Sequence, residues 1–140
     1  MVMEMTTVKM TPIVKEWYDY LAEGKIMGLR CKDCGSIEFP PTPVCKKCSS
    51  TDLEWDEVAT GGTLLSVSYS PVGIPGYTQD PALTGYARMD EGMYFATVID
   101  GVSAEDQDAL LERMRTEDVR VEMTIVPIDE KYFFPHFVLK

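Results

Sequence analysis

Residues 31–48 read "CKDCGSIEFPPTPVCKKC" and hold all four cysteines of the chain, as two Cys-x-x-Cys pairs with ten residues between them. Each pair can form a tight knuckle that presents two sulfurs on one side, and zinc binds four thiolates at about 2.3 Å in closed structural sites. Gly35, directly after the first pair, permits the left-handed backbone that such a knuckle often needs. The spacing therefore predicts one structural zinc ion per chain, held by Cys31, Cys34, Cys45 and Cys48.

Two other interpretations of the four thiols are open at this point. Iron, bound as in rubredoxin, would use the same four sulfurs, so the spacing alone does not separate iron from zinc. Two disulfides or four inert thiols are the remaining alternative, which a reducing compartment disfavours. We expect such a compartment, the cytoplasm, because residues 1–10 lack the charged and then apolar segments of an export signal.

A zinc ion closed by four thiolates has no open coordination position, so it does not activate water. It supplies folding energy instead, roughly 10 kcal/mol or more in small zinc-binding domains. We therefore expect the cysteine segment to be a rigid platform that carries no chemistry of its own.

Charge is distributed unevenly along the 140 residues. The net charge is −10, but residues 1–50 carry seven Lys or Arg and six Asp or Glu, whereas residues 51–140 carry six and seventeen. An acidic body opposes binding to nucleic acid, which depends on neutralising phosphates. No apolar run approaches the roughly 20 residues that a membrane span needs, so we expect no membrane partner.

The pattern of apolar residues predicts a mainly β protein with short helices. Residues 12–23 fit a helix that Thr11 caps and Gly24 ends, and residues 26–30 fit a short strand before the first knuckle. Further strands are expected at residues 63–70, 84–90, 93–99, 118–127 and 131–139, and a second helix, with a capping box, at 103–115.

Three strands, a helix and two strands are the order of a five-stranded OB-fold barrel. Pro135 is expected to make the last strand an edge or bulged strand. We therefore predict an N-terminal helix and rubredoxin-like zinc ribbon in residues 1–57, followed by the barrel in residues 58–140.

The chain resembles a known family in its motifs "YLAEGKIMGLRC", "CKDCGSIEFPPTPVCKKCSS" and "LEWDEVATGGTLLSVSYS". They are similar to those of the zinc-ribbon plus OB-fold proteins of domain-of-unknown-function family thirty-five, also described as acyl-CoA-associated. Thr42 departs from the pattern, since the family often has Arg after the two prolines.

The resemblance implies an accessory subunit in a hetero-oligomer. Members assemble with thiolases, hydroxymethylglutaryl-CoA synthases or hydratase-type enzymes. Their ribbon and barrel help form the channel for CoA and its acyl group, so CoA would be shared with the partner, which performs the chemistry.

The residues agree with a non-catalytic role. Nucleophilic catalysis needs a Cys or Ser beside a base, but all four cysteines are assigned to metal and His136 is the one histidine. "TGGT" at residues 60–63 precedes a strand, which favours a turn or bulge over a phosphate-binding loop. We expect the chain to have no activity alone.

Basic residues cluster around the knuckles: Lys25, Arg30, Lys32, Lys46 and Lys47. They can attract the phosphates of CoA, and Arg30, Lys32, Lys46 and Lys47 are our candidates for that contact. The alternative is that they balance a doubly negative zinc–tetrathiolate centre and the acidic body.

Apolar groups in segments that look exposed are candidates for a partner interface. They are Trp17 and Tyr18 on the first helix, Phe39, Pro40 and Pro41 between the knuckles, and Ile74 and Tyr77 in the loop at residues 70–82. The alternative is that the helix packs on its own chain and the loop is solvated.

Three classes of function follow from these features. The favoured class is a zinc-binding accessory subunit of an acyl-CoA enzyme with a thiolase-fold partner. The second is a nucleic-acid module, because ribbons and OB-folds both occur there, although residues 51–140 are acidic. The third is a rubredoxin-like iron electron carrier, which leaves the barrel unexplained.

Overall fold

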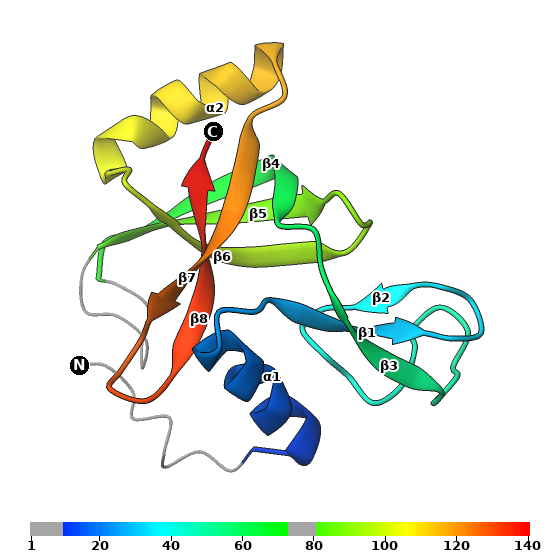
Figure 1. Ribbon diagram of the computed structural model, residues 1–140. Helices are drawn as coiled ribbons and strands as arrows, with labels where there is room; N and C mark the ends of the chain where they lie inside the picture. The colour runs from blue at the N-terminus through cyan, green and yellow to red at the C-terminus, as the bar shows by residue number, and fades with distance from the viewer. Residues whose placement is uncertain (1–9, 73–80) are drawn as a thin grey trace.

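The structure, a computed structural model, describes residues 10–72 and 81–140 and contains a small three-stranded sheet and a closed five-stranded barrel (Figure 1). The elements are α1 (Pro12–Ala22), β1 (Met27–Cys31), β2 (Ile37–Glu38), β3 (Leu53–Glu57), β4 (Gly61–Ser70), β5 (Ala82–Met89), β6 (Tyr94–Asp100), the 3₁₀ turn η2 (Ala104–Asp106), α2 (Gln107–Thr116), β7 (Arg120–Pro127) and β8 (Phe133–Leu139). The predicted fold class is confirmed.

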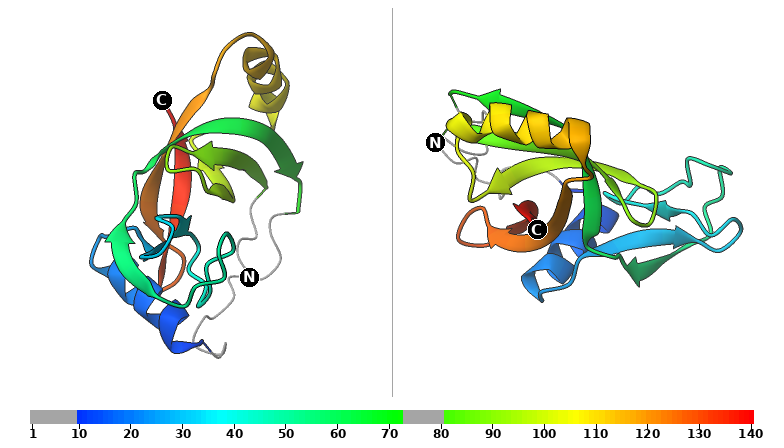
Figure 2. Two further views of the ribbon diagram at one scale, coloured as in Figure 1. Left: turned by 90° about the vertical axis from the view of Figure 1, so that its right-hand side faces the viewer. Right: turned by 90° about the horizontal axis from the view of Figure 1, so that it is seen from above.

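The small sheet projects from one side of the barrel, and the two helices lie near opposite ends of it (Figures 1 and 2). α1 begins as the sequence predicts: the Thr11 hydroxyl accepts a hydrogen bond from the Val14 amide at 3.4 Å, and Pro12 occupies the first turn. It ends just before Gly24, whose φ of +83° is the left-handed conformation typical of a helix end.

β1 is the central strand of the small sheet and pairs antiparallel with both β2 and β3. Leu29 is aligned with Glu38 on one side and with Trp55 on the other. The sequence interpretation assigned no strand to residues 51–57 and so missed β3, whose apolar alternation is limited to Leu53 and Trp55. Residues 53–57 form a strand because each of them pairs with a residue of β1.

The barrel has the strand order β4-β5-β6-β8-β7, and β7 pairs back to β4 to close it. β6 and β8 run parallel, and the other pairs are antiparallel. This is the Greek-key connectivity of an OB-fold, with η2 and α2 between the third and fourth barrel strands. Val121 and Phe137 are fully buried inside it.

Two details of the barrel differ from the sequence-based expectation. The predicted helix at 103–115 is a 3₁₀ turn followed by α2, although the expected capping box between Ser103 and Asp106 is present. The expectation that Pro135 makes the last strand an edge or bulged strand holds only locally: β8 lies between β6 and β7, but its pairing with β6 covers only Phe137 and Val138, so β8 pairs with β7 alone at Pro135. The Thr97 hydroxyl donates to the Pro135 carbonyl at 2.7 Å and so links β6 to β8 beside the proline.

Aromatic side chains join the helix, the small sheet and the barrel. The Trp17 ring meets Phe39 and Phe134 edge-on, both at 5.7 Å between centroids, and its Nε1 donates to the Met27 carbonyl at 2.8 Å. Phe39 in turn meets Phe95 of β6 at 4.9 Å. Such pairs add about 0.5–1.5 kcal/mol each beyond area burial, so they fix the small sheet to the barrel.

A charged contact reinforces the same junction. Arg30 of β1 donates to Asp56 at 2.7 Å and to Glu91, in the β5–β6 turn, at 2.9 Å. Glu91 also accepts from the Ala59 amide at 3.2 Å. The predicted boundary between residues 57 and 58 lies in the connection from β3 to β4 and stays a prediction. No helix within the described ranges is both long enough and apolar enough to cross a membrane.

Candidate metal centre and its surroundings

The two Cys-x-x-Cys pairs form knuckles with the same backbone hydrogen bonds. In the first, the Cys31 amide donates to the Ser36 carbonyl at 2.8 Å and the Gly35 amide to the Cys31 carbonyl at 2.9 Å. In the second, the amides of Cys45 and Ser49 make the equivalent bonds at 2.9 and 2.8 Å. Gly35 has φ of +80°, as its position predicts, and Ser49 takes the same role with φ of +63°.

The knuckles face one another, and one side-chain and one backbone hydrogen bond hold them in that orientation. The Ser50 hydroxyl of the second donates to the Asp33 carboxylate of the first, and the Lys32 amide donates to the Asp52 carbonyl at 2.9 Å. All four Sγ atoms consequently lie within 4.8 Å of one another, with Cys31 to Cys48 and Cys34 to Cys45 at 3.5 Å.

These distances fit a tetrahedral metal ion. Four sulfurs at about 2.3 Å from zinc are about 3.8 Å apart, close to the separations found. A disulfide would need about 2.05 Å between sulfurs, so the four cysteines are present as free thiols that converge on one point. Cys31 and Cys45 are buried, whereas Cys34 and Cys48 reach the surface.

The thiols influence one another's ionisation. The Ser36 amide is the main cause that lowers the pKa of the Cys34 thiol to about 6, helped by hydrogen bonds from Cys45 and Cys48. The Ser50 amide acts on the Cys48 thiol in the same direction, but hydrogen bonding to Cys31 and desolvation outweigh it and raise its pKa to about 12. Thiols this close cannot all ionise without a cation, and a divalent metal ion provides one.

Glu38 is a buried carboxylate beside this centre that the sequence interpretation did not identify. Only 6% of the residue is exposed, and its Oε1 accepts from the backbone amide of Lys46, next to Cys45, at 2.7 Å. β2 thus anchors the second knuckle. A charged residue between the apolar Ile37 and Phe39, in the segment between the knuckles, was the available signal.

Arg30, one of the CoA-phosphate candidates, is committed to neighbours in this chain. Besides its ion pairs with Asp56 and Glu91, it donates to the Gly35 carbonyl at 2.9 Å. These hydrogen bonds raise the pKa of its guanidinium, with Asp56 as the main cause. They favour the charge-balancing interpretation for Arg30.

The candidate lysines differ in their surroundings. Lys32 lies 3.8 Å from Asp52 and 3.9 Å from Glu54, and Lys46 lies 3.9 Å from Glu38. Lys47 is exposed, and within the described ranges it has no ion-pair partner. Lys47 is therefore the most available cation next to the knuckles.

Most of the candidate interface residues are not where their sequence context suggested. Trp17, Tyr18 and Phe39 are 3%, 9% and 5% exposed, because they pack inside this chain, so these three candidates do not present an exposed surface to a partner; for the helix this agrees with the alternative that it packs on its own chain. Pro41 is buried and Pro40 is exposed. Ile74 and Tyr77 lie outside the described residues.

Other apolar side chains do reach the surface. Val44, between the knuckles, is 42% exposed, and Val72, after β4, is 78% exposed. Tyr86 and Tyr94 stack at 5.8 Å on the outer face of β5 and β6, where the alternation of the predicted strands could have located them.

His136 forms a pair with a carboxylate. Its Nδ1 lies 3.0 Å from Asp100, and its side chain is 12% exposed. It belongs to β8, and its neighbour Asp100 ends β6, so the pair connects the two parallel strands. His136 is thus a largely buried histidine held beside a carboxylate.

Comparison with known proteins identifies the cysteine segment. The family described as "ChsH2, rubredoxin-like zinc ribbon domain" matches residues 19–54, which include both knuckles. A DUF35 domain-containing scaffold protein of Methanocaldococcus jannaschii is 27% identical over 97 residues, 67% of this chain and 68% of that protein. The predicted resemblance to the DUF35 family is confirmed.

Two further relatives match this chain over a smaller share of their own length. The benzoylsuccinyl-CoA thiolase subunit BbsA of Thauera aromatica is 29% identical over 76 residues, 54% of this chain and 52% of that subunit. A Lon protease homologue of Thermoplasma acidophilum is 28% identical over 108 residues, 76% of this chain. The chain spans 22% of the length of that homologue, so the similarity does not extend to the whole protein.

Solved DUF35 structures share the fold along almost the entire chain. A chain of the Ltp2-ChsH2(DUF35) aldolase superimposes with a TM-score of 0.73 at 19% identity, covering 94% of this chain and 98% of that one. A DUF35 protein of unknown function from Sulfolobus solfataricus gives 0.59 at 16% identity, covering 99% and 93%. At these identities the likeness shows the fold alone.

Proposed function

We propose that this DUF35 protein is a non-catalytic, zinc-binding accessory subunit of an acyl-CoA enzyme complex with a thiolase-fold partner. The observation that carries the proposal is the similarity to BbsA, which by its name is a subunit of a thiolase acting on an acyl-CoA. The name of another similar protein, a DUF35 domain-containing scaffold protein, agrees with a role in assembly.

The geometry supports the absence of catalysis by this chain. The four thiols face one another, so none is directed at a substrate beside a base. His136 is engaged by Asp100. The metal, when bound, would hold the knuckles together through the four cysteines.

The metal is tested by elemental analysis of the purified chain. We expect about one zinc per chain, and we expect Cys45→Ser to lose it because a closed site depends on all four ligands. Lys47→Ser, in the same knuckle but exposed, is the matched control and should retain the metal. Stoichiometric iron would instead support the electron carrier, and the absence of both metals would refute the site.

We further propose that the ribbon contributes to the channel for CoA, with Lys47 as its phosphate contact. Lys47 is exposed beside the second knuckle, and a lysine provides a mobile charge for a phosphate. In the assembled complex, Lys47→Glu should raise the KM for acyl-CoA while leaving assembly intact. An unchanged KM would exclude Lys47 from the channel.

Assembly is the decisive experiment for the proposed function. A thiolase-fold enzyme should co-elute with the tagged chain purified from native cells, and the same enzyme, purified alone, should lose most of its activity. Val44→Asp or Val72→Asp should weaken co-elution, because apolar side chains at these exposed positions fit a partner surface. Leu111→Asp on α2, 37% exposed, is the matched control. If no thiolase-fold enzyme co-elutes, the proposal is wrong.

Nucleic-acid binding is a second candidate, favoured by the exposed Tyr86 and Tyr94 stack. In OB-folds the face of the second and third barrel strands, here β5 and β6, is a common site for oligonucleotides, and bases stack on aromatic side chains. The seventeen carboxylates of residues 51–140 oppose it. Binding of a single-stranded oligonucleotide that Tyr94→Ala abolishes would favour this candidate.

A further inference from the structure

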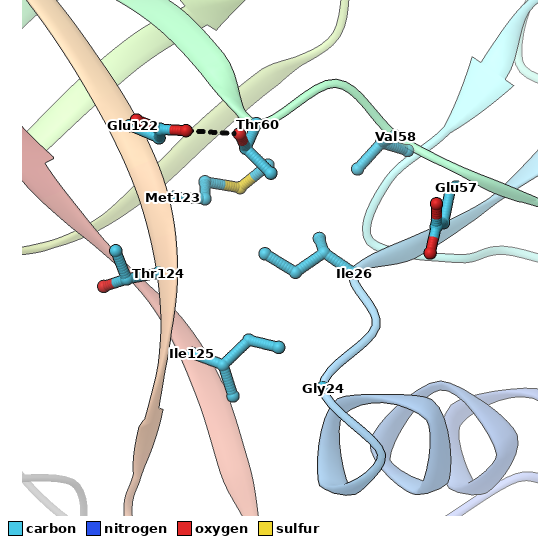
Figure 3. Close-up of a pocket in the computed structure, with 9 residues that line it drawn as sticks. All are labelled: Gly24, Ile26, Glu57, Val58, Thr60, Glu122, Met123, Thr124 and Ile125. Carbon is cyan, nitrogen blue, oxygen red and sulfur yellow. Dashed lines mark hydrogen bonds between the residues drawn. The ribbon is translucent and has the colours of Figure 1, made fainter.

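A cleft of about 360 Å³ lies between the small sheet and the barrel (Figure 3). Ile26 and Val58 line one side, and Met123 and Ile125 of β7 line the other. The carboxylates of Glu57 and Glu122 stand at its rim, so the cleft combines an apolar floor with negative charge.

The cleft exists because two strands that pair along the barrel separate here. β4 pairs with β7 at Gly61 and Glu122, and the Met123 amide still donates to the Thr60 carbonyl at 2.8 Å. Continuing this antiparallel register would bring Val58 opposite Ile125. The Val58 amide instead donates to the Ile26 carbonyl at 3.1 Å, because the chain there has turned toward the small sheet.

The backbone of Ile125 consequently faces an empty strand position. Residues of β7 alternate in the direction of their hydrogen-bonding groups: the Val119 carbonyl and the Met123 amide bond toward the β4 side, whereas the Arg120 carbonyl accepts from Lys140 after β8. Ile125 has the parity of Val119 and Met123. Its N–H and C=O therefore point into the cleft, and within the described ranges no hydrogen bond reaches them from that side.

We propose that this cleft binds a short extended peptide segment of a partner protein, which adds as a strand to β7 opposite Ile125. Main-chain groups of the peptide would pair with the N–H and C=O of Ile125, as in other cases of strand addition. The proposal goes beyond the accessory role and does not depend on which enzyme the chain assembles with.

The lining specifies the side chains of that segment. A residue opposite Ile125 points to the same side as Ile125, into the apolar cleft, and its two neighbours point to the side of Glu122. An apolar residue flanked by basic residues fits this pattern, because lysines there would meet Glu122 and Glu57. Glu57 has no ion pair in the part of the chain described, whereas Glu122 lies 3.5 Å from Lys140.

Pro127 limits the length of the added strand. It follows Ile125 with the same parity and has no N–H to donate. A proline on a strand edge prevents extended pairing with other chains, so the segment gains main-chain bonds only around Ile125. The site is thus suited to a short segment that contributes to a larger interface.

The first test measures amide hydrogen exchange in the free full-length chain. The amides of Thr124 and Val126, whose N–H groups point toward β8, should be protected from exchange. The Ile125 amide should exchange at least about ten times faster because its N–H lacks a partner. Equal protection at the three positions would overturn the proposal. Protection of Ile125 that rises with protein concentration would assign the edge to a second copy of this chain and also overturn it.

The second test titrates the chain with the blocked peptide acetyl-Thr-Lys-Val-Lys-Thr-amide and follows amide NMR signals. The Ile125 signal should shift and its exchange should slow. The same peptide with its central valine N-methylated, which removes one main-chain donor, should bind at least about tenfold more weakly. A peptide with glutamates in place of its two lysines should also bind at least about tenfold more weakly.

Variants of the protein complete the test. Ile125→Pro removes the open N–H without removing a ladder bond and should abolish peptide binding, followed at the amide signals of Met123 and Thr124, while Ile125→Val keeps the N–H and should retain binding. Equal binding of the parent and N-methylated peptides, or no shift at about 5 mM peptide, would refute the site without affecting co-elution with an enzyme. The comparison of peptides is decisive even if Ile125→Pro fails to fold.

Discussion

Substitutions of Glu38 can measure how strongly the fold supports the candidate metal centre. Its carboxylate accepts from the Lys46 amide at 2.7 Å and is almost fully buried, so β2 holds the second knuckle through one charge-assisted hydrogen bond. Glu38→Ala removes the acceptor, whereas Glu38→Gln keeps an oxygen in the same place without the charge. Comparing these two variants distinguishes the contribution of the hydrogen bond from that of the negative charge.

The expected size follows from the kind of bond lost. A hydrogen bond to a charged group contributes about 1.5–3 kcal/mol, which corresponds to a factor of about 10–150 in an equilibrium constant. Metal binding orders the ligands of a structural site, so this cost should appear as weaker zinc binding by Glu38→Ala. A neutral hydrogen bond is worth about 1 kcal/mol, so Glu38→Gln should lose the difference of about 0.5–2 kcal/mol, which corresponds to about 2- to 30-fold weaker binding and is less than the loss in Glu38→Ala.

Zinc affinity is measured by competition with a chromophoric chelator at fixed pH. Lys46→Ala is the matched control, because its Nζ lies 3.9 Å from Glu38 and is mostly exposed, while its backbone amide is unchanged. Such an exposed ion pair contributes little, so Lys46→Ala should change the affinity less than about twofold. If Glu38→Ala binds zinc as tightly as the wild type, or if Lys46→Ala loses as much as Glu38→Ala, the reasoning is wrong.

Two further predictions concern stability. Thr97→Val removes the buried hydroxyl that donates to the Pro135 carbonyl while preserving shape, so the free energy of unfolding in urea should fall by about 1–3 kcal/mol; an unchanged midpoint would contradict this. Ser49→Gly relieves a non-glycine residue at φ +63°, a conformation that costs about 1–2 kcal/mol, and the metal-loaded protein should melt at the same or a higher temperature. A lower melting temperature would show that Ser49 is not strained.

The sequence predicts the features that depend on local patterns. The four cysteines are close in the chain, and their two x-x spacings determine the knuckles, including the positive φ of Gly35. Alternating apolar residues in 118–127 likewise predict β7, whose Val121 and Met123 are buried as expected. The OB-fold was predicted from the order of elements along the chain, with a helix between the third and fourth barrel strands.

Features that depend on distant parts of the chain could not be predicted. Phe39 looks exposed in its loop, but it is buried because Trp17 and Phe95, 22 residues before and 56 residues after it, pack against it. Arg30 looks available for phosphate, but Asp56 and Glu91 engage it through the folding of the small sheet onto the barrel. The backbone groups of Ile125 are free because the chain turns away from β7 at Val58 and toward the small sheet, and no local sequence pattern encodes that turn.

The same junction explains how a metal centre with no chemistry of its own could affect a partner enzyme. Glu38 and Phe39 are consecutive in the chain: the first holds the second knuckle, and the second packs on Phe95 inside the barrel. Arg30, one residue before the first cysteine ligand candidate, is joined to Glu91 on the barrel. Each knuckle is thus tied to the barrel through noncovalent contacts of residues next to it in the chain or in space, so ordering the four thiols also fixes the small sheet relative to the barrel. The cleft at Ile125 lies between those two parts, and metal loss should therefore loosen it as well as the knuckles.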